Sequence, residues 1–231
     1  VPRPTLGAPR RQPVIALVVG CGLSVVALVM AERHHGRARI PAKIVASSCF
    51  VAVAAVNGAA DTTFGTWIII GLALSWLGDV SLLGGGRGPF ALGLTFFLTA
   101  HLAYVVAFVV RPAGEGWVQS PSSSSPVLVI TVIAVLVVGV VAGRWILPRV
   151  DTPLVWPVAA YMVVISVMVL AAGGTVGVDW DARILTGAVL FYLSDIAVAR
   201  DRFISPGWEN RLVGLPLYYA GQVLLAIAAG G

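Results

Sequence analysis

Two aspartates stand at matched positions inside apolar stretches of this 231-residue sequence. Asp79 lies in GLALSWLGDVSLL, residues 71–83, and Asp195 lies in GAVLFYLSDIAVA, residues 187–199. An ionised side chain in such surroundings is costly, so it faces a partner or a wet cavity. Two carboxyl groups in one cavity can act as a general acid and a general base. We therefore take Asp79 and Asp195 as candidate catalytic residues.

Further polar side chains lie in or beside the same apolar runs. Lys43 lies near the start of its run, where it either snorkels to the surface or pairs with a buried acid. For each of the others, a hydrogen bond between helices is the alternative to a functional role. The expected substrate-binding set is Lys43, His101, Tyr104, Ser194, Arg200, Arg202, Tyr218 and Tyr219. Additional candidates for the same cavity are Asn57, Tyr161, Tyr192 and Gln222.

The composition indicates the solvent that surrounds these residues. Hydrophobic residues make up 58% of the chain, charged residues only 11%, and the mean hydropathy is +0.95. Soluble domains carry about 25% charged residues, so lipid must surround much of this chain. The two cysteines lack metal-binding spacing, and we expect neither a metal nor another cofactor. Nothing resembles a nucleic-acid-binding stripe, and the oligomeric state is left unassigned.

The apolar runs predict an all-α polytopic membrane protein, a bundle of eight transmembrane helices. Each run approaches the length of about 20 residues that spans a bilayer. We assign residues 1–12 to an N-terminal tail and residues 13–231 to a single transmembrane domain. The predicted spans are Val14–Ala31, Ile40–Val56, Phe64–Leu83, Phe90–Val110, Val127–Gly143, Leu154–Ala172, Ala182–Ala199 and Arg211–Ala229.

The basic residues predict the orientation of the bundle. Ten of the 15 Lys and Arg residues lie at the end that holds the loops after spans one, three, five and seven. The positive-inside rule then places this end in the cytoplasm and both termini outside. We expect the membrane to be the plasma membrane. Asp79 and Asp195 should lie at equal depth, about 8 Å of helix from the Arg-rich end. The mouth of the site would therefore face the cytoplasm.

The two aspartate segments also share a pattern. Gly71, Leu74, Leu77 and Asp79 align with Gly187, Leu190, Leu193 and Asp195. The segments belong to spans three and seven, so a duplicated four-helix unit would be a parallel repeat. Chance similarity between two apolar-biased segments is the alternative.

Four segments carry a family resemblance: SWLGDVSLL (75–83), FALGLTFFLTAHLAYVVAF (90–108), TGAVLFYLSDIAVARDRF (186–203) and LPLYYAGQVLLA (215–226). From about Lys43 to the C-terminus, the chain resembles the YhhN-like lysoplasmalogenase family of eight-helix membrane proteins. The resemblance implies an ether hydrolase that cleaves the vinyl ether bond of lysoplasmalogens (alkenyl-glycerophosphoethanolamine or -choline). The products would be a fatty aldehyde and a glycerophospho-base. It also implies Asp79 and Asp195 as the catalytic pair.

Paired carboxyl groups suit that chemistry. A vinyl ether hydrolyses through protonation of its β-carbon, and the oxocarbenium ion that results then adds water. One carboxylic acid can donate the proton while a second, ionised carboxylate stabilises the cation, as in glycoside hydrolysis. The lysophospholipid would enter from the bilayer and hold its phosphate near Lys43, Arg87, Arg200 or Arg202.

Other functional classes use membrane acids too. An ion-coupled transporter would suit a parallel repeat, although none of the spans is clearly interrupted by paired Gly and Pro. An intramembrane aspartyl protease would need its acids in Tyr-Asp and Gly-x-Gly-Asp motifs, whereas this chain has LSD and WLGD. We rank the hydrolase first, the transporter second and the protease third, with a purely structural protein behind all three.

Overall fold

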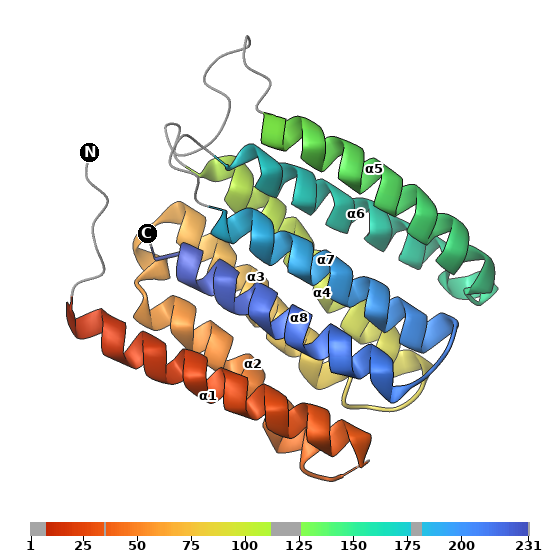
Figure 1. Cartoon of the computed structure of the whole chain (residues 1–231), viewed down its shortest axis with the longest axis horizontal. Coiled ribbons are helices and arrows are strands. Elements are labelled where there is room, and N and C mark those ends of the chain that lie inside the picture. The colour runs from red at the N-terminus through yellow and green to blue at the C-terminus, as the bar shows by residue number, and fades with distance from the viewer. Residues whose placement is uncertain (1–7, 35, 112–125, 177–181, 231) are drawn as a thin grey trace.

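The computed structural model describes residues 8–34, 36–111, 126–176 and 182–230 (Figure 1). These residues form long helices joined by turns and by three short 3-10 segments, Ala59–Asp61, Leu147–Arg149 and Thr152–Leu154, with no strand among them. The all-α fold of eight long helices that the sequence predicts is confirmed. The helices are α1 (Ala8–Arg33), α2 (Arg39–Val56), α3 (Thr63–Ser81), α4 (Arg87–Val110), α5 (Pro126–Ile146), α6 (Val155–Gly174), α7 (Arg183–Phe203) and α8 (Trp208–Ala228).

Local signals set several of the helix ends. Thr62 precedes α3 in an extended conformation, and its side chain accepts a hydrogen bond from the Gly65 amide, as an N-cap residue does. Gly86, with φ of 95°, turns the chain between α3 and α4 in a conformation that side chains disfavour. Arg200 and Arg202 lie in the last turn of α7, where positive charge complements the helix dipole.

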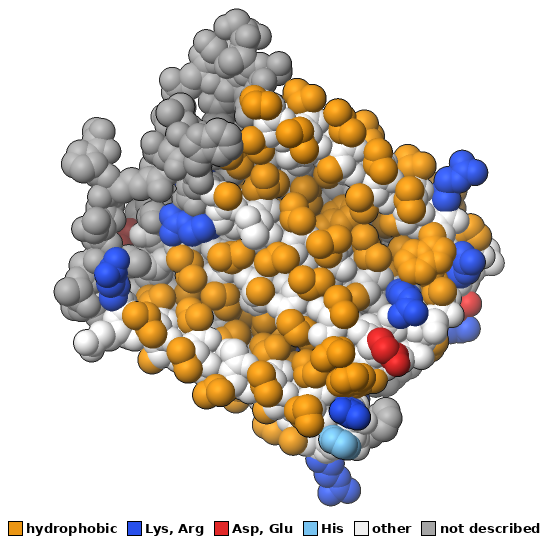
Figure 2. Space-filling model, in the orientation of Figure 1, with side chains coloured by type: hydrophobic (Ala, Val, Ile, Leu, Met, Phe, Trp, Pro, Cys, Tyr) orange, Lys and Arg blue, Asp and Glu red, His pale blue; other side chains and the backbone are white. Residues whose placement is uncertain are grey.

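The helices have the length and composition of membrane spans. Of those in the described chain, every long helix except α7 is apolar enough to cross a bilayer. The exception carries Asp195 and a charged last turn, and it lies between α6 and α8, which do qualify. Apolar side chains cover most of the face in Figure 2, and Lys and Arg gather toward its edges. The protein is thus an integral, multi-pass membrane protein.

Neighbouring helices close into a ring. Contacts join α1, α2, α3, α4, α6, α7 and α8 in succession, and α8 returns to α1, while α5 packs outside the ring against α6. All eight helices run roughly along one direction (Figure 1). The first turn of α1 and the last turn of α8 lie at one end. The opposite end, which we call the mouth end, holds the α1–α2, α3–α4, α5–α6 and α7–α8 turns.

Small residues let the helices beside the site approach closely. A Cβ atom at Gly221 of α8 would lie 2.8 Å from the Gly187 carbonyl oxygen of α7. A Cβ atom at Gly78 would lie 2.7 Å from the ring of Phe97 on α4. Such close contacts stabilise helix association in lipid, where the hydrophobic effect between helices is absent. They bring α7, which carries Asp195, close to α8, and α3, which carries Asp79, close to α4.

The two aspartates differ in their distance from the helix ends. Asp79 lies in the last turn of α3, whereas α7 continues for about two turns beyond Asp195. The prediction of equal spacing from the ends of the two helices is therefore wrong. The glycine-rich segment 84–86 follows α3, while charged residues carry α7 further toward the mouth end.

Candidate functional site

A cavity of about 400 Å³ extends from the mouth end into the ring of helices. Asp79 and Asp195 both line it, so the structure brings the two aspartates to one cavity as the sequence predicts. Polar residues surround the outer part, and apolar side chains from α4, α5 and α6 line another wall. The arrangement suits an amphiphilic molecule with a polar head and an apolar tail.

Asp79 is almost fully buried and is surrounded by donors. Lys43 of α2 lies with its Nζ 3.1 Å from Oδ1. The Ser47 hydroxyl donates to Oδ2 at 2.6 Å, and the Tyr218 hydroxyl donates to the same oxygen at 2.8 Å. An ammonium and two hydroxyl donors together match an ionised carboxylate. Asp79 therefore has the environment of a fixed anion.

Ser47 connects this cluster to Tyr219. Its oxygen lies 3.0 Å from the Tyr219 hydroxyl. Because Ser47 donates its single proton to Asp79, Tyr219 must act as the donor to Ser47. Ser47 is not among the residues predicted from the sequence, although it lies four residues after Lys43 and so on the same face of α2. That spacing was the available signal.

Asp195 has a different set of neighbours. The Tyr161 hydroxyl of α6 donates to its Oδ2 at 2.6 Å. The His101 ring of α4 lies with Nε2 3.7 Å from the same oxygen, beyond normal hydrogen-bond length. The Asp195 side chain keeps 19% of its surface exposed, against 4% for Asp79. The carboxyl group of Asp195 is thus the more accessible of the two and has fewer donors.

Aromatic rings fill the space between the two clusters. Phe191 of α7 packs 4.5 Å from the His101 ring and 5.3 Å from the Tyr218 ring, measured between centroids. Phe97 of α4 lies 5.8 Å from Tyr218, edge to face. These packed rings limit side-chain movement, so the donors around each aspartate are held in place.

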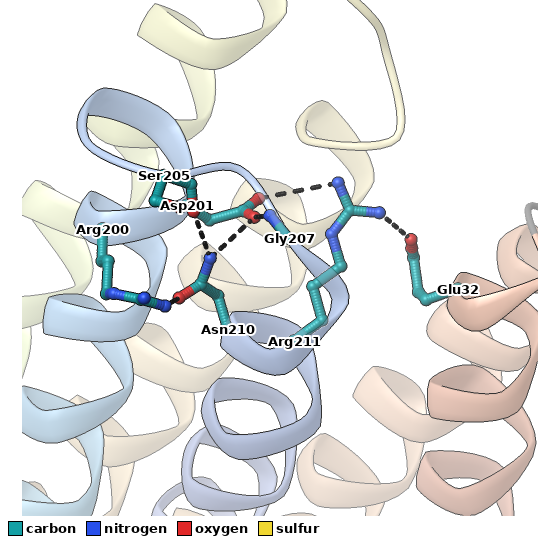
Figure 3. Close-up of polar contacts among 7 residues, drawn as sticks. All are labelled: Glu32, Arg200, Asp201, Ser205, Gly207, Asn210 and Arg211. Carbon is teal, nitrogen blue, oxygen red and sulfur yellow. Dashed lines mark hydrogen bonds and ion pairs between the residues drawn. The ribbon is translucent and has the colours of Figure 1, made fainter.

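Three residues that line the cavity at the mouth end form an ionic bridge (Figure 3). Arg211 of α8 donates to the Glu32 carboxylate of α1 and lies with Nη2 3.5 Å from Oδ2 of Asp201 on α7. The bridge therefore ties three helices together at the place where the cavity opens. Arg39 and Arg202 also line the cavity, and the Arg202 guanidinium lies 4.5 Å from the centroid of the Phe90 ring.

The turn between α7 and α8 is held by a second set of hydrogen bonds (Figure 3). Asn210 donates to the Ser205 carbonyl at 2.7 Å and accepts a hydrogen bond from Arg200. Oδ1 of Asp201 accepts the Gly207 amide at 2.9 Å. Arg200 thus supports the turn and does not line the cavity.

The predicted substrate-binding residues divide into two groups. Lys43, Ser194, Arg202 and Tyr218 line the cavity. The others are not among its lining residues: His101 lies behind Asp195, Tyr104 donates to Gln222 at 2.7 Å, Tyr219 lies behind Ser47, and Arg200 holds the turn. Tyr161 and Tyr192, named only as additional candidates, do line it. Within the described residues, no cluster of three or more His, Cys, Asp or Glu side chains is placed to hold a metal ion.

Comparison with known proteins places this chain in a family. The chain is similar to lysoplasmalogenase TMEM86A from Bos taurus, with 29% identity over 71% of this chain and 65% of the relative. It is 33% identical to lysoplasmalogenase TMEM86B from Homo sapiens, over 68% of this chain and 61% of the relative. The chain thus matches less than two thirds of the length of either relative. No solved structure matches it. The sequence model of the YhhN family matches residues 38–229, and the chain therefore belongs to that family.

Proposed function

We propose that this protein is a membrane hydrolase that cleaves the vinyl ether bond of lysoplasmalogens. The observation that carries the proposal is the single cavity, lined by Asp79 and Asp195, that joins a charged rim to an apolar interior. The names of the curated relatives support the same activity. The products would be a fatty aldehyde and a glycerophospho-base.

The two aspartates would have different duties. Asp79 forms an ion pair with the Lys43 ammonium and accepts hydrogen bonds from two hydroxyl groups. It would therefore stay ionised and stabilise the oxocarbenium ion. Asp195 is more accessible and would deliver the proton to the β-carbon of the vinyl ether. Because its donors already hold Asp79 in place, this carboxylate needs no rearrangement as positive charge develops on the substrate. Such preorganised electrostatic stabilisation is usually the largest single contribution to catalysis.

The rim would hold the substrate's phosphate. Arg39 and Arg202 line the outer cavity, and arginine binds phosphate well through paired N–H donors. Lys43 lies deeper and is engaged by Asp79. The alkenyl chain would then lie along the apolar wall that Phe90, Leu94 and Ile165 contribute to.

The geometry argues against an aspartyl protease. Such enzymes use two carboxyl groups that share one proton. In this chain Oδ2 of Asp79 and Oδ2 of Asp195 each accept hydrogen bonds from separate tyrosines, Tyr218 and Tyr161. The transporter remains the alternative that an activity assay must separate from the hydrolase.

The test is a direct assay of the purified protein. Detergent-solubilised protein should release fatty aldehyde from a defined alkenyl lysophospholipid, and it should not act on the matched alkyl ether, which cannot form the cation by protonation. An Asp195→Asn variant of confirmed fold should be inactive. Substrate that survives unchanged with folded wild-type protein would reject the proposal.

A further inference from the structure

His101 occupies a position that the two-aspartate scheme leaves unexplained. Its side chain is fully buried on α4, behind Asp195. Nδ1 lies 2.5 Å from the Phe97 carbonyl oxygen. Nε2 has no hydrogen-bond partner within the part of the chain that the structure describes, and the Asp195 Oδ2 atom lies 3.7 Å away. A buried polar nitrogen without a hydrogen-bond partner costs free energy, so its presence calls for an explanation. Either a proton lies between Nε2 and Asp195, or the site has a function that requires the free nitrogen.

The carbonyl group fixes the tautomer of the ring. A carbonyl oxygen can only accept a hydrogen bond, so Nδ1 of His101 must carry hydrogen. In the neutral ring, Nε2 then carries a lone pair, and this lone pair faces Oδ2 of Asp195. Two acceptors would repel each other there if Asp195 were ionised. One proton must therefore lie on Asp195 or on Nε2.

We propose that His101 and Asp195 form a pair that holds a single proton, and that this proton is the one delivered to substrate. The proposal deepens the proposed function and rests on it for the identity of the acceptor. Asp195 lines the cavity and would touch the substrate, whereas His101 lies behind it and would act through it. His101 is thus a positioning residue that keeps the proton on the catalytic acid and takes it back.

The pair accounts for every proton in the reaction. Asp195 gives its proton to the β-carbon, and the π electrons of the double bond form the new C–H bond. Water then adds to the α-carbon of the oxocarbenium ion, and the proton that it loses returns to the Asp195–His101 pair. As the hemiacetal collapses, its C–O bond to glycerol breaks, Asp195 gives its proton to the glycerol oxygen, and the hemiacetal hydroxyl returns one proton to the Asp195–His101 pair. The aldehyde and the glycerophospho-base leave without any oxidant or reductant.

Other titratable groups face this pair and belong in any interpretation of its pH dependence. Tyr161 donates to Asp195 from α6 and packs 5.1 Å from the His101 ring, centroid to centroid. Across the cavity are the Asp79–Lys43 ion pair and Tyr218. Tyr192 lines the cavity from α7, and the charged residues of the rim lie further out. The Tyr161 hydroxyl donates its hydrogen to Asp195 and so does not act as a base toward it. His101 is the base that lies nearest to Asp195.

The tautomer can be measured without any activity assay. The chain has three histidines, so the His34→Gln/His35→Gln background leaves one imidazole for ¹⁵N NMR. We expect Nδ1 to carry hydrogen, and we expect Asp195→Asn to shift the pH at which the Nε2 signal changes. A ring with hydrogen on Nε2 and none on Nδ1 would overturn the proposal, as would an Nε2 titration that Asp195→Asn leaves unmoved.

Kinetics provide the second arm. His101→Gln should lower kcat about 100-fold, as for loss of an acid–base group, and should leave KM within about twofold. It should also shift the limb of the pH–rate curve on which activity falls as the pair loses its proton. The matched control is His34→Gln, an exposed loop position, which should keep both kcat and the pH profile. A His101→Gln enzyme whose pH profile is unmoved would make His101 purely structural and overturn the proposal.

The two arms separate the failures. If folded wild-type protein releases no aldehyde, the proposed function fails, and the NMR result still decides whether the proton pair exists. If aldehyde is released but the tautomer is wrong, the hydrolase stands and the pair is rejected.

Discussion

Lys43 and Asp79 form an ion pair inside the membrane bundle, with Nζ and Oδ1 3.1 Å apart and both side chains largely buried. The pair joins α2 to α3 at the inner part of the cavity. A buried acid without a partner could be replaced by a neutral residue at a gain in stability, because its desolvation cost would disappear. The ion pair reverses that expectation, because removing one partner strands the other charge.

Asp79→Asn should therefore destabilise the fold by about 3–5 kcal/mol in the free energy of unfolding, in addition to abolishing activity. Lys43→Met/Asp79→Leu should recover much of the lost stability, because both buried charges are then absent. Thermal or denaturant unfolding in detergent, followed with aldehyde release, measures both effects. A single Asp79→Asn variant as stable as wild type would contradict the ion pair.

Asp195→Asn should abolish activity at a smaller loss of stability. Its carboxyl group accepts from Tyr161 and strands no lysine when it is neutralised. Asparagine keeps the volume and can still accept that hydrogen bond. Asp151→Asn is the matched control, because Asp151 is exposed and pairs with Arg87 at the surface. Turnover per folded molecule should be normal in the control and absent in Asp195→Asn.

Arg202→Gln should raise KM for a phosphate-bearing lysolipid about tenfold, equivalent to about 1.4 kcal/mol, with little change in kcat. The phosphate contact is nearly the same in the ground state and the transition state, so its loss weakens binding. Arg87→Gln is the control, since Arg87 is exposed and does not line the cavity. Equal KM values for the two variants would remove Arg202 from the headgroup site.

Gly221→Ala should destabilise the bundle by about 1–3 kcal/mol, because the added Cβ would lie 2.8 Å from a backbone oxygen of α7. Gly20→Ala in α1 meets nothing within 4 Å and should be neutral or slightly stabilising. Unfolding of the two variants side by side tests the close approach of α7 and α8. If both behave alike, the helices do not pack at this glycine.

The relation between sequence and site is clearest in the residues around the aspartates. Asp79 and Asp195 are visible in the sequence because a charge in an apolar run is exceptional. Ser47 and the Phe97 carbonyl are not, since a serine or a backbone group in a membrane helix is ordinary, and Tyr161 stood out only as an additional candidate. Their importance comes only from the distances of 2.5–2.6 Å that place them against Asp79, Asp195 and His101.

The sequence by itself determined the membrane environment, the eight helices and the two acids, because hydropathy and span length act locally along the chain. Only the tertiary structure decided which helix faces which. Lipid and the bundle interior are both apolar, so a membrane helix carries little pattern that marks its inward face. The rotation of α2 toward α3, and of α4 and α6 toward α7, is set by close packing between distant segments. That packing places Lys43 on Asp79 and His101 behind Asp195.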